Sequence, residues 1–215
     1  MLILPRGKAV KEKIGLKNFD LLDCLKKLQT GHFTGYLRFD CPEGTGVILF
    51  NRGKMIGIFF QKEKENLIAL RALTSIFQNI HTGRSLLHIY SVTTRLLMNL
   101  FEILHGNIIY QGQELLLLDV PFLLQHIKKE HISGALRVYV GTQVAIIFYR
   151  QGAPVGYFHD GGKDIETSAD PGKSLALKDG ACLDLMVSRD SEGMVLVDFN
   201  QSIDLPALWQ KTMAA

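Results

Sequence analysis

The chain contains an internal duplication, and this feature limits its possible folds more than any other. Shifted by 99 positions without a gap, residues 20–59 align with residues 119–158 at ten identical positions out of 40. In the first copy the identical residues are Asp20, Leu25, His32, Gly35, Leu37, Arg38, Ile48, Gly53, Gly57 and Phe59. Apolar residues replace apolar residues at about half of the other positions. The repeat therefore predicts two related units, each of ordinary domain size, within the 215 residues.

Each copy of the repeat predicts a helix followed by three strands. In the first copy, Asn18 or Asp20 caps a leucine-rich helix that ends near Gly31. Strands follow near 35–40, 46–51 and 54–60, and near 134–140, 143–149 and 153–158 in the second copy. The short turn at 51–54 contains a glycine, which supplies the positive φ that a tight hairpin needs. Short hairpin connections predict antiparallel strands, so the expected fold class is α+β, with an antiparallel β-meander packed against helices in each unit.

The two copies differ after their third strand. Apolar residues at helical spacing predict an amphipathic helix over 63–79, and a strand over 86–92 and a second helix to Leu104 follow. The second copy instead has a loop over 159–174, and then strands near 181–187 and 194–199. A helix beginning after Asp204 repeats the start of the helix that follows Asp119. We expect a first unit over 1–112, with a helical insertion at about 63–105, and a second unit over 113–215 with a C-terminal helix.

Charge is concentrated near the N-terminus. Residues 1–64 contain 12 Lys and Arg against 6 Asp and Glu, whereas the whole chain carries a net charge of only +3. Lys8, Lys11, Lys13 and Lys17 are candidate contacts to a protein partner. These lysines lack the interleaved aromatic residues of a nucleic-acid-binding platform, so nucleic acid is not an expected partner.

Cysteine usage and hydropathy indicate the cellular setting. Cys24, Cys41 and Cys182 are odd in number and form no CxxC pair, so the sequence predicts neither a disulfide framework nor a thiolate zinc site. The most apolar tract, over 115–124, is far shorter than the roughly 20 residues of a membrane-spanning helix. The expected localisation is cytoplasmic, without membrane association.

The loop over 159–174 is the candidate site of a small ligand. Gly172, Lys173 and Ser174 resemble the end of a phosphate-binding P-loop, but position 167 is threonine where that motif needs glycine. An exposed turn is the favoured interpretation. Loops carry function more often than scaffolds do, so an anionic-ligand or nucleotide sensor remains the alternative function. The backbone amides near Gly161, Gly162 and Gly172, together with Lys173, would hold the anion.

Two further sets of polar residues have competing interpretations. His126, Glu130 and His131 are spaced wrongly for a zincin helix, and the recurrence of His131 as His32 favours a structural role over metal binding. Arg38 and Arg137 match across the repeat, each between apolar residues of a strand. They either bind an anion or a partner carboxylate, or face solvent in alternation with inward residues, and we favour the second interpretation. The sequence predicts no catalytic, cofactor-binding or metal-binding residues.

The repeated motif resembles the PATAN-type domains of bacterial signalling proteins. The resemblance lies in the leucine-rich helix, the Thr-Gly-Tyr-Leu or Ser-Gly-Ala-Leu strand, and the Phe-Asn-Arg-Gly-Lys-Met-Ile-Gly hairpin. It covers about 40 residues of each copy and implies a protein without catalytic residues that acts through protein contacts. We therefore expect a non-enzymatic scaffold or adaptor in bacterial cytoplasmic signalling or motility control. Its partner is unidentified, and a homodimer is a further expectation because exposed edge strands invite pairing.

Overall fold

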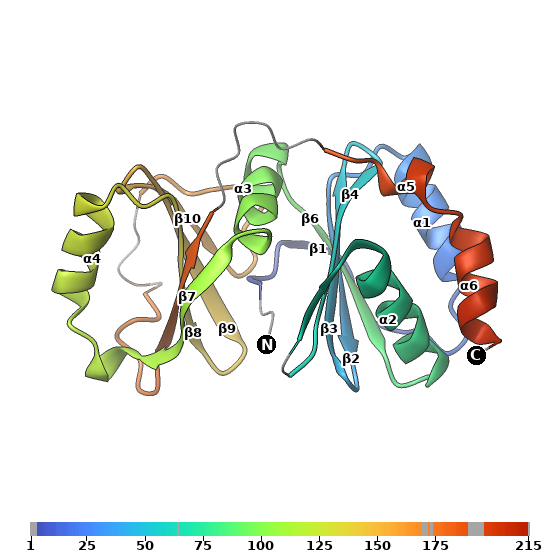
Figure 1. Cartoon of the computed structure of the whole chain (residues 1–215), viewed down its shortest axis with the longest axis horizontal. Coiled ribbons are helices and arrows are strands. Elements are labelled where there is room, and N and C mark those ends of the chain that lie inside the picture. The colour runs from blue at the N-terminus through green and yellow to red at the C-terminus, as the bar shows by residue number, and fades with distance from the viewer. Residues whose placement is uncertain (1–3, 64, 169–171, 173, 189–195, 215) are drawn as a thin grey trace. The chain divides into compact units, whose positions relative to one another are not determined.

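The structure is a computed structural model that describes residues 4–63, 65–168, 172, 174–188 and 196–214. The chain forms two compact units (Figure 1). The first comprises residues 1–2, 8–97 and 195–215, and the second comprises residues 3–7 and 98–194. Both units combine an antiparallel sheet with helices, which confirms the predicted α+β class. None of the helices among the described residues has the length and apolar character needed to span a membrane.

The first unit contains a six-stranded sheet in the order β1-β6-β2-β3-β4-β5. Its strands are β1 (Lys8–Gly15), β2 (Gly35–Cys41), β3 (Gly44–Asn51), β4 (Lys54–Gln61), β5 (Asn66–Ile68) and β6 (Leu86–Ser91). Four helices, α1 (Leu21–Thr30), α2 (Ala69–His81), α5 (Phe199–Ser202) and α6 (Leu205–Met213), lie on one side of this sheet (Figure 1). Asp20 caps α1 by accepting the Asp23 backbone N–H at 2.9 Å, as expected for an N-cap aspartate.

The second unit contains a five-stranded sheet in the order β10-β9-β8-β11-β7. Its strands are β7 (Asn107–Glu114), β8 (Gly134–Val140), β9 (Gln143–Arg150), β10 (Ala153–His159) and β11 (Cys182–Val187). A 3-10 turn, η1 (Leu115–Leu117), leads into α4 (Val120–Lys129), which packs on the sheet through Leu123 and Ile127. The remaining helix, α3 (Thr94–Leu104), follows β6 in sequence.

The duplication extends beyond the residues that are identical between the copies. The bounds of β1, α1, β2 and β3 become those of β7, α4, β8 and β9 when 99 is added to each residue number. Both β1 and β7 have irregular pairing with their neighbour, and in each a residue has positive φ at the same repeat position: Lys13 at 54° and Gly112 at 65°. The two units therefore share backbone detail that their residue identities do not reveal.

The hairpin turns agree with the prediction. Arg52 and Gly53 have φ values of 50° and 81°, and Gln151 and Gly152 have values of 48° and 79°. Two consecutive residues with positive φ define the type I′ turn, which matches the twist of an antiparallel hairpin. A Cβ atom added at Gly53 would lie 2.2 Å from the Gln29 carbonyl oxygen, so glycine is also required here by close approach.

The C-terminal segment differs from its predicted place. We expected it in a second unit over 113–215, whereas residues 195–215 belong to the first unit by their contacts. The physical reason is apolar packing: the Trp209 ring lies 4.9 Å from the Phe77 ring of α2, edge to face. The strand predicted near 194–199 lies partly outside the described residues. Its described part, 196–199, is not a strand, because Asp198 caps α5.

Candidate functional site

The lysines predicted as partner contacts lie on an edge strand. Lys8, Lys11 and Lys13 belong to β1, the outermost strand of the first sheet, and Lys17 follows it; all four are exposed. Lysines and bulges on an edge strand prevent unintended pairing with other strands. The structure thus places three of the four lysines on one strand. Protection of that exposed edge is a structural explanation for their presence.

Arg38 and Arg137 do not face solvent, so the favoured interpretation of these residues was wrong. The alternation with inward residues is present, but both arginines are held in ion pairs on the opposite side of the sheet. The Arg38 Nε donates to Asp40 Oδ1 at 2.7 Å, and Arg137 Nε donates to Asp184 Oδ2 at 2.7 Å. Asp184 is fully buried and also accepts the Gly112 N–H at 2.6 Å. The Arg38 pair lies within β2, whereas the Arg137 pair connects β8 to β11.

The loop predicted to bind an anion uses its amides internally. The Gly161 N–H donates to the Arg6 carbonyl at 2.6 Å, and the Gly162 N–H donates to the His159 carbonyl at 3.0 Å. Gly172 is not free of interactions either, and Lys173 lies outside the described residues. Asp160, beside these glycines, pairs with Arg6 at 3.2 Å. The amides of Gly161 and Gly162 are therefore not available to an anion in this structure.

The repeated histidines have a backbone explanation. His32 and His131 have φ values of 51° and 50°, the left-handed conformation that ends α1 and α4. Histidine tolerates this conformation better than most side chains do. His126 stacks on Phe122, and within the described residues no group of three His, Cys, Asp or Glu side chains is placed to hold a metal ion.

A polar cluster around His88 was not predicted from the sequence. His88 pairs across the sheet with Arg38, and its Nε2 lies 3.3 Å from Asp40 Oδ2. Burial lowers the pKa of His88 below its ordinary value, while the Asp40 carboxylate opposes this shift. Nothing in the sequence indicated this cluster. His88 lies outside the aligned repeat, and its strand, β6, is far from β2 in the sequence although the two strands pair in the folded protein.

The His88 cluster fastens β1 to the sheet. The Lys13 N–H donates to His88 Nδ1 at 3.4 Å, and the Tyr90 hydroxyl donates to Glu12 Oε1 at 2.6 Å. An acceptor role for Nδ1 assigns the proton of the neutral ring to Nε2. Each of these contacts joins neighbouring strands, so the cluster has a structural task at the bulged edge strand.

A hollow of about 550 Å³ lies where β2 turns into β3, lined by Cys41, Gln61 and Lys62 among others. The Lys62 ammonium pairs with Glu43 at 3.0 Å on its rim. Burial raises the pKa of the Cys41 thiol to about 11, so this cysteine is not a reactive thiolate at neutral pH. The hollow therefore offers mixed charge without an activated nucleophile.

The helical layer of the second unit leaves part of its sheet uncovered. Leu124 of α4 is 39% exposed, whereas its repeat equivalent Leu25 of α1 is 1% exposed. The same contrast holds on the strands under the helices. Ile147, Tyr149 and Tyr157 are half-buried and Pro154 is exposed, whereas their equivalents in the first unit, Ile48, Phe50, Ile58 and Met55, are at most 1% exposed. We call the surface formed by Leu124, Ile147, Tyr149, Pro154 and Tyr157 the open helical face.

Four of these residues come from the side of the sheet that α4 covers, and Leu124 comes from α4 itself. Tyr157 pairs directly with Ile147 across the two strands, and Pro154 pairs with Tyr149, so all four side chains lie on the same side of the sheet. Ile147 and Tyr149 pack at the margin of the core beneath α4. Burial and the neighbouring Tyr157 raise the pKa of Tyr149 to about 12. The open helical face is thus an apolar surface with two tyrosine hydroxyls.

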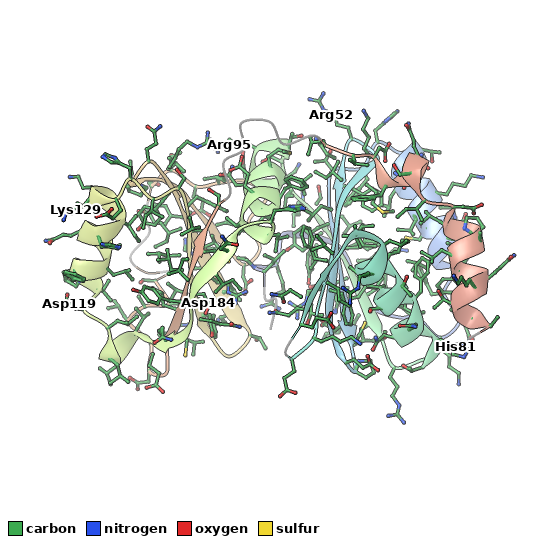
Figure 2. All side chains as sticks on the ribbon, in the orientation of Figure 1. Arg52, His81, Arg95, Asp119, Lys129 and Asp184 are labelled. Atoms are coloured by element: carbon green, nitrogen blue, oxygen red, sulfur yellow. The ribbon has the colours of Figure 1, made fainter. Side chains whose placement is uncertain are left out.

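The helix α4 has a charged residue at each of its ends. Asp119 caps the start of the helix and Lys129 ends it (Figure 2). Between these ends α4 contains no acidic residue, and no ion pair of Lys128 is found in the described part of the chain. A Cβ atom added at Gly152 would lie 2.8 Å from the Lys128 Cα, so Lys128 lies beside the turn between β9 and β10. This lysine gives one end of the surface a positive charge.

The fold and this surface define a class: a duplicated α+β protein with an apolar surface on its second unit. Residues 2–104 match the model of a family described as "Uncharacterized protein conserved in archaea (DUF2226)". The matched residues contain the whole first copy of the repeat and none of the second. No curated protein and no solved structure matches the chain.

The family match corrects the resemblance to PATAN-type domains, which was wrong. The residues that carried the resemblance in the first copy match a different family. A leucine-rich helix followed by a glycine-turned hairpin is common to many α+β proteins, so the motif was too general to identify a family. The bacterial signalling setting was inferred from that resemblance and is withdrawn with it.

Proposed function

We propose that this protein is a non-enzymatic interaction module, a scaffold or adaptor, that binds a partner protein through the open helical face. One observation carries the proposal: five apolar positions that are buried in the first unit are exposed or half-buried at the same repeat positions of the second. Burying such side chains against a partner is favourable at roughly 25 cal/mol per Å² of apolar surface. An exposed apolar surface of this kind is typical of a protein-binding site.

The polar groups of the two sheets support a non-enzymatic role. The Arg137 and Asp184 pair and the cluster around His88 each engage their charged atoms with neighbouring strands. Groups held this way stabilise the fold and are not directed at a substrate. We include a reducing compartment, the cytoplasm, in the proposal because the three cysteines are free thiols, and burial raises the pKa of both Cys24 and Cys41.

The proposal is tested by affinity capture from the native lysate with the whole chain as bait. Three baits are compared: the parent, Leu124→Glu in the open helical face, and Ile109→Glu on β7, at the other edge of the same sheet. A partner captured by the parent and by Ile109→Glu, but lost with Leu124→Glu, supports the proposal. If no protein distinguishes Leu124→Glu from Ile109→Glu, the open helical face does not bind a partner in this lysate and the proposal fails.

One further bait and one measurement in solution examine the other expected contacts. The quadruple change of Lys8, Lys11, Lys13 and Lys17 to Glu tests whether β1 contributes to binding. Size-exclusion chromatography with light scattering, over a range of protein concentrations, tests whether the partner is a second copy of the chain. Because β1 and the open helical face lie in different units, loss of binding in one bait alone identifies the unit involved.

A further inference from the structure

We infer that the open helical face binds an amphipathic α-helix of a partner protein, one that carries an acidic residue near its N-terminal end. This inference rests on the proposed function and specifies the partner. The internal repeat provides the argument, because the equivalent surface of the first unit is visible in its covered state. What covers it there indicates what fits the second unit.

In the first unit, the equivalent surface is covered by a helical segment. The core that contains Leu25, Ile48, Phe50, Met55 and Ile58 is covered by apolar residues of α5, α6 and the link between them: Phe199, Ile203, Leu205, Leu208 and Trp209. The segment is anchored by the Asp198 carboxylate, which accepts the Met55 N–H at 3.2 Å, and by Asn200, whose Nδ2 donates to the Gly53 carbonyl at 3.0 Å. A short amphipathic segment with an acidic residue at its start therefore fits this type of surface.

In the part of the chain that the structure describes, no such helix belongs to the second unit. The α5 and α6 segment follows β11 in sequence but belongs to the first unit. Among the described residues, the region between β10 and β11 forms no helix comparable to α2, although Leu175 joins the core. The five residues of the open helical face stay less covered than their equivalents, which leaves this surface available to a helix of a partner.

The anchor for the acidic residue differs between the units. Pro154 takes the place of Met55 and has no N–H to donate to a carboxylate. Lys128 takes the place of Gln29, beside the turn that corresponds to the anchored end of α5. The ammonium of Lys128 can replace the missing backbone donor with a charge-assisted hydrogen bond. We therefore expect the acidic residue of the partner helix to bind the Lys128 ammonium, whereas Asp198 binds a backbone N–H in the first unit.

The test uses a fluorescein-labelled peptide of residues 196–214, the sequence that covers the equivalent surface. Its binding to the full-length protein is measured by fluorescence anisotropy for the parent, Leu124→Glu, Lys128→Glu and the control Ile109→Glu. We expect saturable micromolar binding to the parent, weakened at least about tenfold by Leu124→Glu and about threefold or more by Lys128→Glu, and unchanged within twofold by Ile109→Glu. A Trp209→Ala peptide should bind at least about tenfold more weakly.

Hydrogen exchange locates the bound peptide. Protection over residues 143–157 supports the inference, because these residues form β9, the turn after it and most of β10. Absence of saturable binding up to about 100 μM, equal binding by Leu124→Glu, or protection only over residues 44–61 of the first unit overturns it. The lysate capture separates the two levels: a partner lost with Leu124→Glu, when the peptide fails, leaves the proposed function standing and rejects only the helical occupant.

Discussion

Asp184 connects three strands of the second sheet, because its carboxylate on β11 bonds Arg137 of β8 and Gly112 of β7. Its side chain is fully buried and neutralises Arg137, so Asp184→Ala leaves a buried guanidinium without its partner. Breaking a buried ion pair from one side costs about 3–5 kcal/mol, and we expect a loss of this size in the free energy of unfolding. Urea denaturation of Asp184→Ala against the parent measures it.

The double variant Arg137→Met and Asp184→Leu is the matched control for this loss. It removes both charges and fills the space with apolar atoms, so it should retain most of the stability that the single variant loses. A single variant that costs less than about 1 kcal/mol would show that the pair is not buried as the structure has it.

His88 makes stability depend on pH. Burial lowers the pKa of its imidazole in the folded protein below the ordinary value of 6.5, so the unfolded chain takes up this proton at a higher pH. Stability from this group is therefore complete above pH 6.5 and is lost as the pH falls toward the lowered pKa. Asp40, Arg38, Glu12 and the Lys13 backbone surround the ring and set the size of the effect.

The measurement is the thermal midpoint of the parent and of His88→Gln between pH 7.5 and pH 5. We expect the parent to lose stability more steeply than His88→Gln on acidification, because glutamine keeps polar atoms at the site without titrating. Parallel curves for the two proteins would mean that His88 does not change its pKa on folding.

At the scale of elements, the glycines that open the first strand of each meander are required by close approach. A Cβ atom at Gly35 would lie 2.1 Å from the Tyr90 carbonyl oxygen, and one at Gly134 would lie 2.0 Å from the Met186 carbonyl oxygen. Gly35→Ala and Gly134→Ala must each push neighbouring strands apart, at a cost of about 1–3 kcal/mol. Gly15→Ala is the control, since nothing lies within 4 Å of its Cβ position.

Chemical denaturation of the three alanine variants tests this expectation, with Gly15→Ala predicted to lie within about 0.5 kcal/mol of the parent. Equal stabilities for all three would contradict it. The same carbonyl contact in both copies explains why glycine is identical across the repeat at this position.

Much of the fold was predictable because the repeat carries local signals. Asp20 and Asp119 cap their helices, and two glycine-containing turns close the hairpins, so the order of elements over 20–59 and 119–158 follows from nearby residues. The assignment of α6 was not predictable, because it depends on Trp209 meeting Phe77 far away in the sequence. The equivalence of Lys13 and Gly112 was not predictable either, because these residues share a positive φ but differ in residue type.

The open helical face was beyond sequence reasoning for a related physical reason. Leu25 and Leu124 are identical in sequence, and only their tertiary surroundings make one buried and the other exposed. The predicted site residues were chosen for charge or for glycine content, whereas the exposed positions are apolar and look like ordinary core.

At the scale of the whole molecule, the last helical segment of the chain, α5 and α6, packs on the first unit. A shortened chain that ends at residue 197 lacks α5 and α6 and should expose the core surface of the first unit around Met55, while the second unit keeps its own contacts. We expect faster amide exchange in β3, β4 and α2, and little change in β8 and β9, because opening is local to the unit that loses its cover. Hydrogen exchange followed by mass spectrometry measures both units in one sample.

When the peptide of residues 196–214 is added to this shortened chain, it can bind the equivalent surfaces of both units, and their affinities for it can be compared in one sample. The first unit offers its Met55 N–H to Asp198, whereas the second offers Lys128, so the first surface should fill at low peptide concentration and with little dependence on salt. The second surface should fill at higher concentration and weaken as salt screens the lysine. Protection that returns to both units together, at one concentration and one salt dependence, would mean that the repeat does not distinguish the two surfaces and that Pro154 and Lys128 do not set the difference between them.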